Sequence, residues 1–134
     1  MKKLIFILIM LPVVAFSQEN LQQSAENFII SYLKMFEEKK WDEIPNAWAK
    51  DAQIVRLDGV ISPAAEMIKN VIKNNSPTIV SEKNDIIWIK TDAFDSNTAM
   101  VSVRYIETVK RTTDPLRVTD NVGVFLAVKE EGVW

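Results

Sequence analysis

The stretch LQQSAENFIISYLKMFEEK, residues 21–39, decides the fold class of this chain. Its apolar residues recur at steps of three and four, which places them on one face of an α-helix. They are Leu21, Ala25, Phe28, Ile29, Tyr32, Leu33 and Phe36. The opposite face is charged or amidic and reads as a solvated surface. The sequence therefore predicts an amphipathic helix whose apolar stripe packs against another layer of the protein.

Two further helices are predicted after this one. Residues 41–50 form a short helix with Pro45 in its first turn. The next helix has Ser62 as its N-cap and Pro63 at its first helical position, and the run Asn74-Asn75-Ser76-Pro77 ends it. The sequence thus predicts three helices in the N-terminal part of the chain.

The remaining segments are rich in Val, Ile, Thr and aromatic residues, as strands are. They are residues 52–57, 78–81, 86–90, 99–109 and 118–129, separated by the breakers Asp58-Gly59, Lys83-Asn84-Asp85, residues 94–97 and Thr113-Asp114-Pro115. An order in which helices come first and strands follow is typical of the α+β class. We expect a roll in which three N-terminal helices pack in a strongly bent, mainly antiparallel sheet.

The first residues are typical of a signal peptide. Lys2 and Lys3 precede an apolar run, residues 4–16, that is too short to span a bilayer, and Ala15 and Ser17 fit a cleavage site. We expect cleavage after residue 17, a single domain over residues 18–134, and a periplasmic or secreted product without a membrane anchor. The chain stops at a Gly-Val-Trp turn, which fits either a missing last strand or a short natural C-terminus.

Composition excludes several kinds of chemistry. The chain has no His and no Cys, so Ser-His and Cys-His catalysis, disulfides and soft-metal sites are excluded. No carboxylate run has calcium-loop spacing, and we expect neither a metal nor another cofactor. The net charge of −2 argues against nucleic acid as a partner.

Several short motifs resemble the nuclear transport factor 2-like superfamily, and more narrowly its small, exported, SnoaL-like members. They are Tyr32-Leu33-Lys34-Met35-Phe36, Lys40-Trp41-Asp42-Glu43-Ile44, Trp48-Ala49-Lys50-Asp51-Ala52, Asp58-Gly59 and Glu131-Gly132-Val133-Trp134. The resemblance implies a cone of three helices in a bent sheet around an apolar pocket. Its members include isomerases, dehydratases, cyclases and hydrolases as well as binding domains, so it does not decide between binding and catalysis.

The strand over residues 99–109 offers the first candidate site. Ala99, Val101, Val103, Tyr105 and Glu107 share one face. Inside a cone, the phenol of Tyr105 and the carboxylate of Glu107 would act as proton donor and base. The alternative interpretation is a core tyrosine beside a carboxylate at the rim.

Arg56 and Asp58 share a strand face and form the second candidate site. As a polar pair they would bind a carboxylate or polarise a carbonyl of the ligand, and Asp58 is in addition a weak catalytic candidate. Asp before Gly is also ordinary turn composition. Tyr32, Phe36, Trp48 and Trp88 form the third candidate, an aromatic pocket wall, although aromatic residues at such spacing commonly build the core.

Two functions from different classes follow. The first is an exported domain that binds a small apolar molecule without catalysis, and the second is an acid–base enzyme of isomerase, dehydratase or hydrolase type. A carboxylate with a raised pKa inside the pocket would favour the enzyme. We also expect a homodimer through the outer sheet face, with Met100, Ile106 and Phe125 as contributors.

Overall fold

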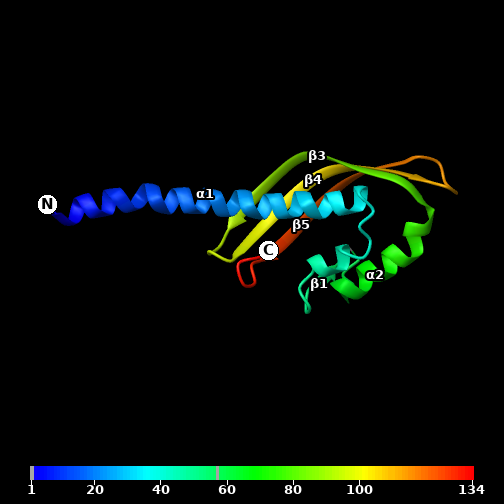
Figure 1. Ribbon diagram of the computed structural model, residues 1–134, viewed down its shortest axis with the longest axis horizontal. Helices are drawn as coiled ribbons and strands as arrows, with labels where there is room; N and C mark the ends of the chain where they lie inside the picture. Colours follow the sequence, from blue (N-terminus) through cyan, green and yellow to red (C-terminus); the bar gives the residue numbers. More distant parts are fainter. Residues whose placement is uncertain (1, 57) are drawn as a thin grey trace. The chain divides into compact units, whose positions relative to one another are not determined.

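Figure 1 shows the computed structural model, which describes the backbone of residues 2–56 and 58–134 and the side chains from residue 20 onward, except residue 57. The elements are α1 (Lys2–Glu37), η1 (Ile44–Ala47), β1 (Gln53–Val55), β2 (Ile61–Pro63), α2 (Ala64–Asn75), η2 (Ser76–Thr78), β3 (Ile79–Ala93), β4 (Thr98–Arg111) and β5 (Arg117–Val128). The strands form a two-stranded sheet, β1-β2, and a three-stranded sheet in the order β3-β4-β5. Short connections between consecutive neighbours make the larger sheet antiparallel. The α+β class is confirmed.

The predicted signal peptide falls on residues 1–17, whose side chains lie outside the described residues. Among the helical residues that are described, none forms a segment long and apolar enough to cross a bilayer.

The chain divides into two compact units. Unit 1 contains the chain up to residue 30 together with residues 86–104 and 122–134, and unit 2 contains residues 31–85 and 105–121. The helix α1 and the three long strands contribute residues to both units, and each unit is described by itself.

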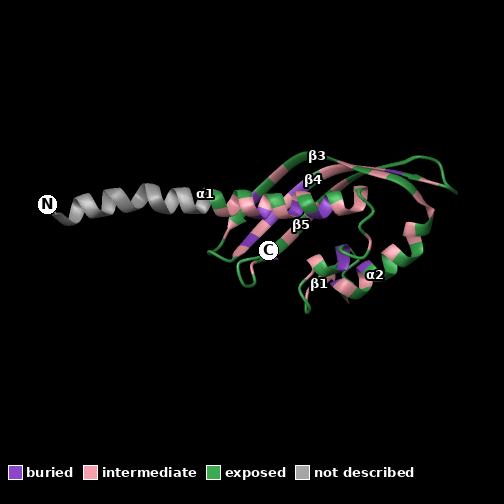
Figure 2. Cartoon of the chain, in the orientation of Figure 1, coloured by how far each residue is buried: buried purple, intermediate pink, exposed green. Residues whose placement is uncertain are grey.

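Unit 1 has a core of small and β-branched side chains. On β4, Ala99, Val101 and Val103 are fully buried and alternate with less buried neighbours, as the period-two pattern predicts (Figure 2). Ala25 and Ile29 of the helical stripe are also buried in this unit. The stripe and the β4 face therefore supply the apolar interior that the sequence predicts.

The two ends of unit 1 are fixed by hydrogen bonds. The indole Nε1 of Trp134 donates to Ser24 Oγ of α1 at 2.6 Å. The β3–β4 hairpin turns at the predicted breaker, where Phe94 N donates to Thr98 O at 2.9 Å (Figure 1).

Phe125, which we expected on the outer face, instead shares the β5 face of Ala127, which is only 5% exposed. In this unit the even positions of β5 are exposed whereas Phe125 is half-buried, and for that reason Phe125 does not belong to the outer set.

Unit 2 holds α2, the short helices and the β1–β2 hairpin. The hairpin is antiparallel, with Ile54 paired to Ser62, and Ala64 N donates to Ala52 O at the start of α2. The buried apolar residues of this unit are Tyr32, Leu33, Ile44, Ala64, Ile68 and Val109. They come from helices and from β4, so this unit also has an interior of its own.

The prediction of three N-terminal helices is wrong in one element: the described residues contain two α-helices. Residues 41–50 contain turns and η1, a single 3-10 turn in which Trp48 N donates to Pro45 O. Trp48 itself has an extended backbone, with φ −98° and ψ 134°. Burial of Ile44 and Pro45 fixes this compact conformation, and a regular helix does not continue through it.

Two predicted boundaries also shift. Ser62 lies in β2 opposite Ile54, and Pro63 takes the N-cap position of α2, so Ser62 does not cap the helix. The predicted breaker Lys83-Asn84-Asp85 does not interrupt β3. Lys83 Nζ pairs with Asp85 Oδ1 at 2.6 Å on the exposed face, while Asn84 is held by α1, and these contacts keep the polar residues in strand conformation.

Candidate functional site

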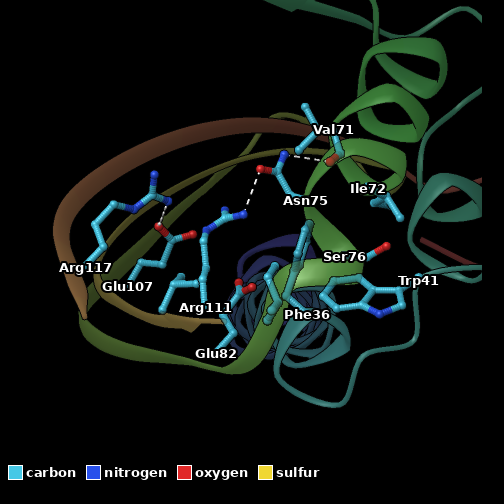
Figure 3. Close-up of a pocket in the computed structure, with 12 residues that line it drawn as sticks. Phe36, Trp41, Val71, Ile72, Asn75, Ser76, Glu82, Glu107, Arg111 and Arg117 are labelled. Atoms are coloured by element: carbon cyan, nitrogen blue, oxygen red, sulfur yellow. Dashed lines mark hydrogen bonds and ion pairs between the residues drawn. The ribbon is translucent and has the colours of Figure 1, made fainter. Parts of the chain in front are cut away.

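A cavity of about 270 Å³ opens in unit 2, and its two sides differ in chemistry (Figure 3). The apolar side consists of Phe36, Trp41, Val71, Ile72 and Ile79, and the charged side consists of Glu82, Glu107, Arg111 and Arg117; Asn75, Ser76 and Val109 complete the wall. The cavity can therefore hold a molecule with an apolar body and a polar group.

The end of α1 positions the two aromatic residues of the wall. Lys39 adopts a left-handed conformation with φ 57°, Lys39 N donates to Phe36 O, and Lys40 N donates to Met35 O. This pair of bonds is the Schellman ending of a helix, here without glycine. It turns the chain back so that Trp41 meets Phe36 edge to face, with ring centroids 6.3 Å apart.

The charged side is built by strand alternation. Glu107, Val109 and Arg111 follow one another at every second position of β4, so their side chains leave the same face. Arg117 lies at the start of β5, and its Nη2 pairs with Glu107 Oε2 at 3.0 Å. The side chain of Glu107 is 22% exposed and that of Arg117 is 58% exposed, so this ion pair borders solvent.

Arg111 is held by neutral partners. Its Nη1 donates to Asn75 Oδ1 at 2.9 Å and to Thr78 Oγ1 at 3.1 Å. Asn75 Nδ2 in turn donates to Val71 O at 2.7 Å, and Thr78 Oγ1 donates to Asn75 O at 2.9 Å. The guanidinium is therefore attached to the C-terminal end of α2, where a positive charge also complements the helix dipole.

Glu82 of β3 is a carboxyl group in this wall whose ionisation is disfavoured by its surroundings. Burial raises its pKa above the usual value, and the nearby charges of Glu107 and Glu37 act in the same direction. A hydrogen bond from Asn84 Nδ2 and the charge of Arg111 oppose this rise without cancelling it. A half-buried carboxyl group with a raised pKa holds its proton more firmly than an exposed one, which is a property of many general acids and bases.

Phe36 and Glu107 are the residues predicted for the site that line this cavity. Tyr105 shares the β4 face of Glu107 but does not line the cavity. It is half-buried, and burial, then Glu107, then Glu82 raise its pKa. Tyr32 and Trp48 pack edge to face, and Trp48 Nε1 donates to Tyr32 Oη at 3.1 Å. The structure thus places Tyr32, which is 6% exposed, in the core of the unit.

The other predicted positions lie in exposed segments. Arg56 Nη2 pairs with Asp58 Oδ2 at 2.9 Å, and both side chains are more than half exposed in the turn between β1 and β2. Asp58 Oδ1 also accepts a bond from Val60 N, as a turn-forming Asp does. Trp88 of β3 is 41% exposed and belongs to unit 1. These residues do not line the cavity.

Sequence reasoning missed Glu82, Arg111 and Arg117. A signal for Arg111 was present, because the alternation that selects Tyr105 and Glu107 also selects position 111 when it is continued along β4. Glu82 had no such signal. It follows a short predicted strand and comes just before a predicted breaker, so only the continuous course of β3 places it in the wall.

A second hollow of about 320 Å³ shares Trp41 and Ile72 with the first cavity and is bordered also by Lys69 and Lys73. Within the described residues, no group of three or more carboxylates is close enough together to hold a metal ion.

No family model and no curated protein matches the chain. Solved structures do match. A protein from Novosphingobium aromaticivorans assigned as a scytalone dehydratase aligns with a TM-score of 0.75 at 13% identity, over 84% of this chain and 76% of that one. A protein from Xanthomonas campestris pv. campestris assigned as a polyketide cyclase aligns with a TM-score of 0.57 at 15% identity, over 83% and 84% of the two chains. The beta subunit of a benzoate 1,2-dioxygenase from Burkholderia mallei aligns with a TM-score of 0.54 at 14% identity, over 75% and 73%.

These three structures have the nuclear transport factor 2-like fold, so the predicted resemblance is confirmed at the level of the fold. At such low identity the likeness concerns architecture, and function is argued from the site itself.

Proposed function

We propose that this protein binds a small amphipathic organic molecule in the cavity of unit 2. The observation that carries the proposal is the division of the wall into an apolar side and a charged side (Figure 3). Small-molecule sites are usually lined by apolar and aromatic side chains with a few placed polar groups. Similar structures include proteins assigned as a dehydratase and a cyclase, which supports a role with small molecules.

Filling the cavity tests this proposal. Val71 borders the cavity and Val80 does not, and each of the two valines is 43% exposed. With 2-naphthol as the probe in calorimetric titration, we expect Val71→Trp to weaken binding about tenfold or more and Val80→Trp to change it less than about twofold. Equal affinity of both variants and the parent protein would contradict binding at this site.

A second candidate function is acid–base catalysis on such a molecule, and Glu82 is the observation that favours it. A pocket carboxylate with a raised pKa is the feature that favours an enzyme over a binding domain, and Glu82 has this feature. Tyr105, whose pKa is also raised, stays protonated at neutral pH but does not line the cavity, so Arg111 is the candidate hydrogen-bond donor. In this candidate, Glu82 takes a proton from the carbon next to a carbonyl, and the guanidinium of Arg111 in the same wall donates a hydrogen bond to the developing oxyanion.

Deuterium exchange tests the catalytic candidate. We expect the protein to accelerate exchange of the α-protons of 2-tetralone in D₂O, followed by NMR, and Glu82→Gln to lower the rate by about 10²-fold or more. Asp92→Asn, at an exposed position of the same strand, is the control and leaves the rate unchanged. Exchange no faster than in buffer would remove this candidate while leaving the binding proposal intact.

A further inference from the structure

Arg111 is a cation in the cavity wall that is held by neutral partners and interacts with the charge of Glu82 only from beyond ion-pair distance. In the described part of the chain, no carboxylate oxygen lies within ion-pair distance of its guanidinium, in contrast to Arg117, which pairs with Glu107 at 3.0 Å. Its bonds to Asn75 and Thr78 use only Nη1, and both partners are neutral. The guanidinium is therefore fixed in place while its other N–H groups remain for a ligand.

An oriented guanidinium favours one kind of ligand group. Its planar fork matches the two oxygens of a carboxylate and binds them with two parallel hydrogen bonds. A half-buried cation that lacks a direct ion pair gains from such a ligand, because the ligand charge offsets the cost of burial. The neutral anchors make this geometry possible, since they fix the guanidinium without cancelling its charge.

The rest of the wall narrows the class of ligand. Glu82 and Glu107 line the same cavity and repel negative charge, so a dianion such as a phosphate monoester is disfavoured more strongly than a monoanion. In the close-up, Trp41 and Ile72 lie on the side opposite Glu107 and Arg117, and Phe36 lies between them and the charged groups (Figure 3). A single negative charge at one end of an apolar body fits both features.

We propose that the ligand is a monocarboxylic acid with an apolar body, bound with its carboxylate on Arg111 and its body against Phe36, Trp41 and Ile72. This inference rests on the proposed binding function and adds the chemical class of the ligand. Arg111 also connects β4 to the end of α2, so the test separates charge recognition from this structural role.

The test uses three probes that share one body: 4-phenylbutanoate, 4-phenylbutanamide and 4-phenylbutan-1-amine. Their dissociation constants are measured by calorimetry on the full chain at neutral pH. We expect the acid to bind about tenfold or more tightly than the amide, and the amine to bind most weakly. Arg111→Gln should bring acid and amide to within about twofold of each other while changing the amide affinity little.

Two controls keep the result interpretable. Lys110→Gln removes a charge from the exposed position next to Arg111 and should preserve the preference for the acid. If Arg111→Gln does not fold, judged by circular dichroism, Arg111→Lys is used; it keeps the charge and loses the fork, and should reduce the preference without abolishing it.

The outcomes separate the two proposals. If wild type binds the amide as tightly as the acid, or the amine most tightly, carboxylate recognition is overturned and the binding function stands. A preference for the acid that survives in Arg111→Gln also overturns it. If none of the three probes binds, the inference falls together with the proposed cavity function.

Discussion

At the scale of single residues, the two tyrosines of the chain can be separated by titration. Burial raises the pKa of Tyr32 to about 12, and the hydrogen bond from Trp48 opposes this only in part. In Tyr105→Phe we therefore expect one tyrosinate step in the near-ultraviolet absorbance, centred near pH 12. Because the folded-state pKa lies above the unfolded value of about 10, the stability that Tyr32 contributes is complete below pH 10 and is lost as pH rises through 12. A step near pH 10 in the folded variant would contradict the burial of Tyr32.

Glu82 gives a second prediction at this scale. Its folded-state pKa is raised above 4.5, so the folded protein binds its proton more tightly than the unfolded chain does. Folding stability consequently falls as pH rises from 4.5 through the folded-state pKa. Glu82→Gln removes this loss, and we expect it to raise the free energy of unfolding at pH 8 by less than about 1 kcal/mol, with no gain at pH 4. Urea unfolding at both pH values measures this; a gain that is equal at both would disprove the assignment.

At the scale of elements, the link between α1 and β3 rests on Glu37. Its Oε1 accepts a hydrogen bond from Asn84 N at 2.6 Å, and Asn84 Nδ2 donates to Leu33 O at 3.3 Å. Glu37→Ala leaves a part-buried backbone N–H without this acceptor, so we expect a loss of about 1–2 kcal/mol in the free energy of unfolding. Glu38→Ala is the matched control at an exposed position and should leave unfolding unchanged. Equal effects of the two changes would show that the Glu37 contact carries no stability.

The same elements show what the sequence can predict. Periodicity locates the later part of α1, α2 and β4, because their apolar faces are buried with the regular spacing of the secondary structure. The strand β5 is located by its strand-forming composition, because its aliphatic row is exposed. Periodicity fails where tertiary contacts decide the local structure. Asn84 is an example: its polar side chain suggests a break in the strand, but Glu37 and Leu33 provide hydrogen-bond partners that keep it in β3. The candidate site is harder to predict than the fold. Glu107 and Phe36 follow from strand and helix patterns, whereas Glu82 enters the wall only through the uninterrupted course of β3.

At the scale of the whole molecule, export is the first property to test. We propose that residues 1–17 are removed and that the chain acts outside the cytoplasm, a proposal motivated by the basic start, the short apolar run and the small residues before Gln18. Intact-mass measurement of the protein recovered outside the cytoplasm should give a chain that begins at Gln18. Recovery of that material with Met1 still present would contradict cleavage.

Self-association is the second property at this scale, and we propose that it uses the exposed face of β5. In unit 1, Val122, Val124, Leu126 and Val128 are between 45% and 67% exposed at alternate positions, and β5 lies at one end of the order β3-β4-β5. A row of exposed aliphatic side chains on a regular strand costs solvation free energy that a second copy of the chain would recover. Wild type should therefore sediment as a dimer.

Charge placed on this face should separate the dimer. We expect Val124→Lys combined with Leu126→Lys to raise the dimer dissociation constant about tenfold or more, because like charges would then be buried in the interface. The control combines Val60→Lys with Ile61→Lys at exposed positions of unit 2, 48% and 59% accessible, and should leave the dimer intact. Sedimentation velocity across a concentration series distinguishes these results. A wild type that stays monomeric throughout the series would refute the interface, and equal dissociation in both variants would show that β5 is not the surface involved.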